Sequence, residues 1–250
     1  KLWSGITWKK NHRVLVLTPS SLLWSLKPLR EVIEGGVILA ASKDNHPRLL
    51  AELEVLAPME RPVLIDSKVE SIKKLEDNLK FEVIGGRIPW KTFSEKSFSE
   101  LWPILTEKCT ANAELSLIIS NPCSGPALSL KKSLEVYDND ENIDFSFLNN
   151  IIIQENKWLN NQDQKKIFVL QLKKLGWNVS FEDWTEFVYL KVDSLIIKRW
   201  LNPGSDYRKI ILKHYKEDTL IRLEKLFKKL DGHTIKQKLL HTKIFAINNN

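Results

Sequence analysis

The sequence is poor in the residues that build metal centres, disulfide frameworks and membrane spans. It has two cysteines, Cys109 and Cys123, and their separation fits neither a metal site nor a disulfide framework. No apolar run approaches the roughly 20 residues that cross a bilayer, and no signal-peptide pattern opens the chain. These absences predict a protein without a membrane span that works in a reducing cytoplasm.

Signals for catalysis are scarce as well. No Ser or Cys stands in a nucleophile-elbow context. The histidines lack metal-ligand spacing; they are His12, His46, His214, His233 and His241. We therefore predict no catalytic residue and no metal site.

Methionine is nearly absent. Met59 is the only one, and the chain begins at Lys1 without an initiator methionine. This start predicts a fragment of a longer protein, with partner domains elsewhere in that protein.

What the sequence does have is a regular alternation of short apolar runs and helical stretches up to residue 120. Strands are predicted at about 13–17, 37–41, 62–65, 81–84 and 115–119, with Gly85-Gly86 ending the fourth. Helices are predicted at about 22–33, 46–56, 68–78 and 96–107. Short apolar runs are typical of parallel strands that are covered on both faces. The pattern predicts a three-layer, Rossmann-like α/β fold with a mostly parallel sheet.

After residue 120 the pattern changes. Residues 120–150 read as a loop or insertion with one helix at 127–134. Further elements are expected as a helix at 160–175, a strand at 177–181, a helix at 190–200, basic helices over 205–230 and a last strand at 243–247. We predict a single domain over 1–250, with a basic helical insertion at about 186–240 before the last strand.

This order of elements, with KKLGWNV and KIFAI near its end, resembles class I S-adenosylmethionine-dependent methyltransferases. The resemblance implies a seven-stranded sheet whose last two strands, 177–181 and 243–247, form an antiparallel hairpin. It covers most of the chain as a pattern of elements, but its motifs are degenerate.

The first motif of that family, an acid followed by three spaced glycines, is lost. Val16 replaces the acid, and Thr18, Ser20 and Leu22 replace the glycines. Glycine allows a tight turn and close approach of the backbone to a ligand, and Leu22 is expected to intrude on that space.

The second and third motifs are partly kept. Ala41 and Ser42 stand where the family has a ribose-binding acid, and Asp44 is the nearest carboxylate. Asp66 matches the polar residue that meets the adenine amino group. The resemblance thus implies a vestigial cofactor site, and its residues are Thr18, Ser20, Ser42 and Asp66.

Each of these positions has a second interpretation. Thr18, Ser20 and Ser21 either cradle an anion or cap the following helix. Asp66 either contacts a ligand or caps the next helix. Arg87 and Trp90 stand where the family places its acceptor, or they are a solvent-facing cation and a packed ring.

A closer resemblance is to the uncharacterised C-terminal domain fused behind a recombination-factor AAA+ ATPase of the replication-associated recombination family. The Trp-rich start and the turn VLVLTPSSLLW carry it. It implies a cytoplasmic domain beside a motor of DNA recombination and replication, with that ATPase as partner.

The basic character is confined to one segment. Residues 1–204 carry 27 Lys and Arg against 26 Asp and Glu, whereas residues 205–243 carry 11 against 5. The segment either follows a nucleic-acid backbone or is the solvated face of amphipathic helices. The candidate contacts are Arg208, Lys209, Lys213, Arg222, Lys225, Lys228 and Lys229.

Two functions follow. The first is a non-catalytic, methyltransferase-like interaction module of a DNA-maintenance ATPase, without a cofactor and with DNA as a candidate partner. The alternative is an active S-adenosylmethionine-dependent methyltransferase with an atypical cofactor loop. The residues alone leave open whether the chain is an enzyme.

Overall fold

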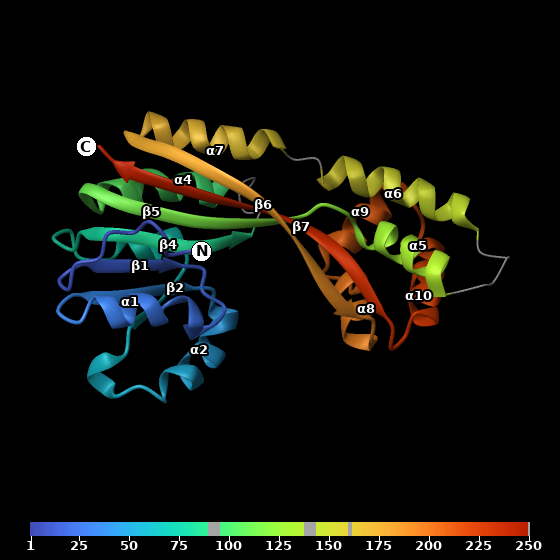
Figure 1. The fold of residues 1–250 in the computed structure, drawn as a ribbon, viewed down its shortest axis with the longest axis horizontal. Helices are drawn as coiled ribbons and strands as arrows, with labels where there is room; N and C mark the ends of the chain where they lie inside the picture. Colours follow the sequence, from blue (N-terminus) through green and yellow to red (C-terminus); the bar gives the residue numbers. More distant parts are fainter. Residues whose placement is uncertain (90–95, 138–143, 160–161, 250) are drawn as a thin grey trace. The chain divides into compact units, whose positions relative to one another are not determined.

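The computed structural model describes residues 1–89, 96–137, 144–159 and 162–249 (Figure 1). Contacts divide the chain into two compact units. Unit 1 comprises Lys1–Ser120, Gln162–Asp183 and His241–Asn250, and unit 2 comprises Asn121–Asn161 and Trp184–Leu240. The basic insertion lies in unit 2 together with the segment Asn121–Asn161. That the chain is one domain stays a prediction.

A seven-stranded sheet has the order β3-β2-β1-β4-β5-β7-β6. Its strands are β1 (Arg13–Leu17), β2 (Gly36–Ala41), β3 (Val63–Asp66), β4 (Phe81–Pro89), β5 (Cys109–Pro122), β6 (Trp177–Lys191) and β7 (Thr234–Asn248). The pairs β1–β2, β1–β4, β2–β3 and β4–β5 are all parallel. The predicted Rossmann-like, mostly parallel sheet is confirmed.

Strand β7 runs against its neighbour β5. The Asn248 side chain donates to the Thr110 carbonyl at one end, and Ser120 Oγ meets His241 Nδ1 nearer the other. Residue numbers rise along β5 as they fall along β7, so the pair is antiparallel. The same reversed correspondence links β7 to β6, where Thr242 donates to Asp183 and Ser180 donates to the Phe245 carbonyl.

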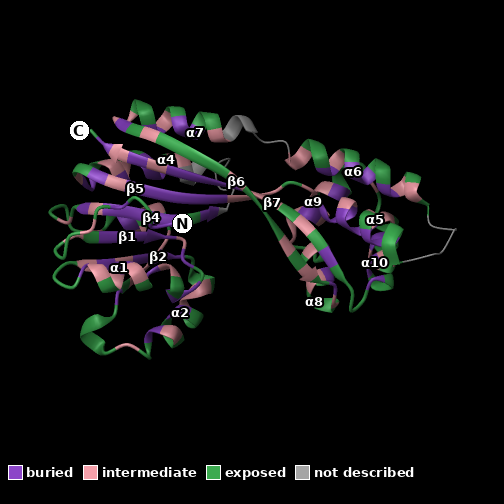
Figure 2. Ribbon diagram, viewed as in Figure 1, coloured by how far each residue is buried: buried purple, intermediate pink, exposed green. Residues whose placement is uncertain are grey.

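The helices of unit 1 cover a core of apolar strands (Figure 2). They are α1 (Leu26–Glu31), α2 (His46–Leu53), α3 (Val69–Lys73), α4 (Lys96–Glu107) and α7 (Gln162–Lys174), with short 3-10 turns η1 (Leu22–Trp24), η2 (Lys43–Asn45) and η3 (Pro58–Glu60). Leu15, Ile84 and Leu115 on three neighbouring strands have no exposed surface. Burial on both faces explains why these strands read as continuous apolar runs.

The Gly85-Gly86 pair continues strand β4, whereas we expected it to end the strand. Gly85 pairs with Ser116 and Gly86 with Leu117. An ideal Cβ on Gly86 would stand 2.5 Å from the Leu17 carbonyl oxygen, and one on Gly85 would stand 2.2 Å from the Trp3 ring. Here glycine serves close packing against the strand rather than a turn.

The first predicted helix is broken. The expected helix over 22–33 is instead η1 followed by α1, with Pro28 inside α1. Ser25 ends the first element, because its N–H donates to the Leu22 carbonyl in a single 3-10 turn. The chain before β1 forms turns, and Trp3 and Trp8 lie with ring centroids 5.7 Å apart.

Unit 2 is built around helices. They are α5 (Pro126–Tyr137), α6 (Phe145–Leu159), α8 (Ser194–Leu201), α9 (Asp206–His214) and α10 (Glu217–Lys229). Helix α6 was not predicted. Strands β6 and β7 are also longer than expected, reaching Lys191 and beginning at Thr234, so the insertion between them is shorter than 186–240.

Candidate functional site

The carboxyl ends of β1, β2 and β3 lie side by side at one edge of the sheet. Leu17 pairs with Ala40, and Ala41 pairs with Asp66. The strand order reverses between β1 and β4. In open α/β sheets ligands bind outside the strand ends at such a reversal, so this edge is the candidate site.

Thr18 forms a strained turn directly after β1. Its φ is +48°, in the left-handed region that a β-branched residue rarely adopts. Its N–H donates to the Ala40 carbonyl at 2.8 Å, and its Oγ1 donates to the Arg87 carbonyl at 2.7 Å. The two hydrogen bonds connect β1, β2 and β4 and hold the turn in a conformation suited to glycine.

The carboxylate of Glu52 accepts hydrogen bonds from two groups of the loop that follows Thr18. Glu52 on α2 accepts from the Leu22 N–H at 2.6 Å and from the Ser21 hydroxyl at 3.1 Å. The Leu22 hydrogen bond is the main reason that the pKa of Glu52 is lowered, and Arg48 at 2.8 Å adds to it. Ser21 also caps η1 by accepting from the Leu23 N–H at 3.3 Å, while Ser20 is exposed.

Leu22, expected to fill the space above the loop, is buried at 6% exposure, whereas Leu23 is 72% exposed. That Leu22 intrudes on the ligand space stays a prediction.

The other two predicted cofactor residues stand at neighbouring strand ends. Ser42 is exposed, precedes η2 and makes no side-chain cap hydrogen bond. Asp66 is half-buried, and its Oδ1 accepts from the Lys68 N–H at 3.2 Å. At the end of β2, the His46 ring nitrogen lies 3.1 Å from the Ala41 carbonyl oxygen.

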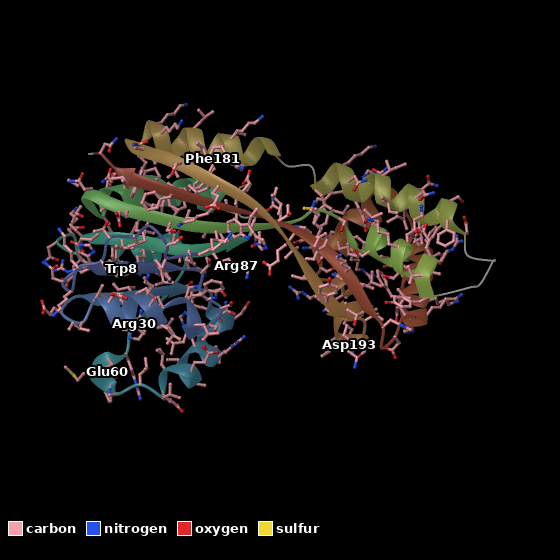
Figure 3. The ribbon with its side chains drawn as sticks, in the orientation of Figure 1. Trp8, Arg30, Glu60, Arg87, Phe181 and Asp193 are labelled. Carbon is pink, nitrogen blue, oxygen red and sulfur yellow. The ribbon has the colours of Figure 1, made fainter. Side chains whose placement is uncertain are left out.

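A polar chain of side chains begins at the carboxyl end of β4. Arg87 (Figure 3) is exposed and donates to Ser120 Oγ at 3.0 Å, and Ser120 Oγ lies 2.8 Å from His241 Nδ1. The Arg87 guanidinium also lies 5.7 Å from the Trp24 ring. The structure thus holds this cation between a ring and a hydroxyl. Trp90, the other expected residue of this segment, lies outside the described residues.

Three of these contributors were missed from the sequence. Glu52, Ser120 and His241 meet partners that are 30, 33 and 121 positions away along the chain. Short-range spacing patterns in the sequence do not indicate contacts between residues so far apart along the chain. Only the expectation that β5 and the last strand are neighbours could have placed Ser120 beside His241.

The candidate nucleic-acid residues are spread over α9 and α10, and several are paired. Arg208 contacts Glu217 at 2.5 Å and Lys228 contacts Glu224 at 2.7 Å. Arg222 contacts Asp144 at 2.8 Å, and its guanidinium lies 3.9 Å from the Phe147 ring. Lys209 lies 3.6 Å from Asp206. Lys213, Lys225 and Lys229 are exposed. Their role in binding stays a prediction.

The apolar residues between these cations are buried. They are Tyr207, Ile211, Leu220, Leu223 and Phe227. Their spacing is therefore that of a helix face packed into a core.

None of the helices among the described residues is long and apolar enough to cross a membrane. Within the same residues, no three or more His, Cys, Asp or Glu side chains are grouped so as to hold a metal ion.

Comparison with known proteins gives matches at the level of structure. No protein-family model and no curated protein sequence matches the chain. A candidate methyltransferase of Bacillus halodurans is 10% identical with a TM-score of 0.54, over 98% of this chain and 95% of that one. The YcgJ protein of Bacillus subtilis is 13% identical with a TM-score of 0.54, over 97% and 94%.

A third solved structure bears on the cofactor. Phosphoethanolamine N-methyltransferase 2 of Haemonchus contortus, in complex with S-adenosyl-L-methionine, is 13% identical with a TM-score of 0.49, over 98% of this chain and 50% of that one. Our expectation that no cofactor is used is wrong, since the fold is matched over nearly its whole length by a structure described as a methyltransferase. The structural matches show that the chain has the Rossmann-like α/β fold of class I methyltransferases.

Proposed function

We propose that the chain is an S-adenosylmethionine-dependent methyltransferase that holds its cofactor at the carboxyl ends of β1, β2 and β3. The observation that carries the proposal is the left-handed turn at Thr18, next to the point where the strand order reverses. Strained backbone of this kind costs about 1–3 kcal/mol and clusters at ligand sites. A chain that binds nothing here gains no advantage from keeping it.

The polar side chains at the ends of β2 and β3 suit the cofactor's adenosyl group. The Asp66 carboxylate accepts hydrogen bonds from amino or hydroxyl groups, and the exposed Ser42 hydroxyl lies at the neighbouring strand end. At the end of β1, the Thr18 hydroxyl is bonded to the Arg87 carbonyl, which ties the turn to β4. When bound, S-adenosylmethionine would supply the electrophilic methyl group.

Arg87 is the candidate for acceptor binding. It is exposed, and its orientation is set by Ser120 and by the Trp24 ring. A guanidinium held in this way orients an anionic group through paired hydrogen bonds.

Calorimetry with S-adenosylmethionine and S-adenosylhomocysteine tests the cofactor site. We expect micromolar binding by the unaltered chain and a loss of about tenfold or more for Asp66→Ala, since one good hydrogen bond to a charged group contributes about 1.5–3 kcal/mol. Glu60→Ala is the matched control, because Glu60 is exposed in η3, before β3 rather than at its carboxyl end. Absence of binding, or equal affinities of the two variants, would overturn the assignment.

A second candidate is the non-catalytic interaction module of a DNA-maintenance AAA+ ATPase. The observation that favours it is Glu52, whose carboxylate accepts from the Leu22 N–H and the Ser21 hydroxyl and so occupies polar groups of the loop from within the chain. This candidate predicts that no methyl group is transferred. Incubation with labelled S-adenosylmethionine and cell-extract fractions separates the two, because only a methyltransferase produces S-adenosylhomocysteine in step with a labelled product.

A further inference from the structure

Unit 2 contains a cavity of about 520 Å³ that is separate from the candidate cofactor site. One wall is a single face of α5, whose lining residues recur at helical spacing: Leu128, Ser129, Lys132, Ser133, Val136 and Tyr137. The opposite wall comes from alternate residues of β7 with Phe187 of β6; the β7 residues are Thr234, Lys236 and Lys238. Side chains at every second position of a strand share one face. Cys123 and Ser124 complete the lining.

The lining is positively charged. Lys132, Lys236 and Lys238 supply three ammonium groups, and none of the described residues that line the cavity is acidic. The hydroxyls of Ser129 and Ser133 lie on the wall that carries Lys132. With no carboxylate among the described lining residues, these three cations create a positive potential inside a concave wall, which favours an anionic ligand.

The same cavity presents aromatic surface. Phe187 and Tyr137 line it, and the Lys236 ammonium lies 3.9 Å from the Phe187 ring centroid. Phe187 and Tyr137 are also among the exposed large apolar side chains of the chain, at 48% and 52%. Exposed rings beside cations suit a ligand that joins a planar group to an anion.

We propose that this cavity binds a small organic phosphate that carries a planar ring, of the size of a nucleoside monophosphate. Its volume lies within the roughly 300–1,000 Å³ range of small-molecule sites. The phosphate is bound by the three lysines and the α5 hydroxyls, and the ring packs on Phe187 and Tyr137. The proposal does not depend on the cofactor site, which lies in unit 1.

Calorimetry on the full chain with uridine 5′-monophosphate, uridine and inorganic phosphate tests the proposal, with S-adenosylhomocysteine present at saturation throughout. We expect the monophosphate to bind, inorganic phosphate to bind more weakly and uridine not to bind. The double variant Lys236→Gln/Lys238→Gln is expected to lower the affinity about tenfold or more, since each charge-assisted hydrogen bond contributes about 1.5–3 kcal/mol. Lys213→Gln/Lys225→Gln removes the same charge from exposed positions outside the cavity and should leave the affinity unchanged.

Alkylation of Cys123 provides a readout on the unaltered chain. Cys123 is exposed and lines the cavity, whereas Cys109 is buried. Bound monophosphate is expected to slow the reaction of Cys123 with iodoacetamide. Equal losses of affinity in the two double variants, equal binding of uridine, or an unprotected Cys123 would each overturn the proposal. Protection by an oligothymidylate but not by the monophosphate would also overturn it, in favour of a nucleic-acid site.

Discussion

The two units of the chain treat their buried charges differently. In unit 1 the buried Lys108 and Lys243 send their ammonium groups to carbonyl or hydroxyl oxygens of Leu75 and Ser4. In unit 2, Glu155 of α6 is fully buried. Long cationic side chains can bury an apolar stem and keep the charge at the edge, but a buried carboxylate cannot. Unit 1 thus pairs two buried ammonium groups with carbonyl and hydroxyl oxygens, whereas unit 2 places a carboxyl group among its buried helices.

Glu155 joins three helices. Its carboxylate accepts from the Ala127 N–H at 2.7 Å and the Leu128 N–H at 3.3 Å at the start of α5, and from the Tyr207 hydroxyl of α9 at 2.5 Å. An ideal Cβ on Gly125 would stand 2.2 Å from this carboxyl group, so glycine is required there. The carboxylate fills the place of a cap for α5 and fixes α6 and α9 against it.

The largest predicted effect is the removal of this group. Glu155→Ala leaves the buried Ala127 N–H, the half-buried Leu128 N–H and the Tyr207 hydroxyl without their acceptor, and we expect a loss of about 3–5 kcal/mol in the free energy of unfolding. Urea unfolding followed by circular dichroism measures it. Glu135→Ala is the control, because Glu135 on α5 is exposed and forms a surface ion pair with Lys131 at 3.7 Å. A loss of less than about 1 kcal/mol, the size of an ordinary substitution, would contradict the role given to Glu155.

The second prediction concerns pH. Burial raises the pKa of Glu155 from 4.5 to about 7, against the opposing effect of its three hydrogen bonds. The folded chain therefore binds this proton more tightly than the unfolded chain does. The stabilising contribution is complete below about pH 4.5 and is lost as the pH rises to and through 7, by about 3 kcal/mol at 1.36 kcal/mol per pKa unit.

The variant Glu155→Gln isolates this contribution, since it keeps the shape and cannot ionise. We expect the free energy of unfolding of the unaltered chain, relative to that of Glu155→Gln, to fall between pH 4.5 and 7.5. Two parallel pH profiles in urea measure the difference. A difference that is flat, or that rises with pH, would mean that the buried carboxylate is ionised throughout this range.

The difference between the apolar strands of unit 1 and the helices around Glu155 in unit 2 explains which elements the sequence could predict. The apolar runs at 14–17 and 115–119 are buried on both faces, so hydrophobicity alone located their strands. Helix α6 was missed although Leu148, Ile151, Ile152 and Glu155 are spaced as one buried helix face. We missed this pattern because a polar run, 138–144, precedes the helix and because Glu155 places a charged residue on its buried face.

The candidate site was predictable only in part. Thr18, Ser42 and Asp66 follow predicted strands, and neighbouring parallel strands bring their ends to one edge, so their grouping follows from the topology. The acceptor of the loop donors, Glu52, lies on another helix, and no sequence spacing indicated it. Gly85-Gly86 was misread because glycine marks both turns and close packing, and only the contact with Leu17 distinguishes the two.

A third prediction compares two glycines, one in each unit. Gly86→Ala places a methyl group 2.5 Å from the Leu17 carbonyl oxygen, where only backbone movement makes room, and we expect a loss of about 1–3 kcal/mol. Gly204 has no atom within 4 Å of an ideal Cβ, so Gly204→Ala should be neutral or stabilise by about 0.4–1 kcal/mol. Thermal unfolding of both variants measures the contrast. Equal melting temperatures would contradict the close packing of β4 on β1.

The smallest predicted effect concerns two helix starts. Asp193 (Figure 3) precedes α8 in unit 2, and its Oδ1 accepts from the Leu195 and Ile196 N–H groups, both at 2.9 Å. Asp193→Ala should lower the free energy of unfolding by about 1 kcal/mol, as is typical for a lost N-cap. Ser42 stands before η2 in unit 1 without a side-chain cap hydrogen bond, so Ser42→Ala should change the free energy of unfolding by less than about 0.5 kcal/mol.

Because Ser42 is also a proposed cofactor contact, Ser42→Ala separates a role in binding from a role in folding. A side chain that serves binding rather than folding should lower the affinity for S-adenosylmethionine in calorimetry while the urea midpoint stays unchanged. A loss of stability without a loss of affinity would assign Ser42 to the fold and remove it from the site.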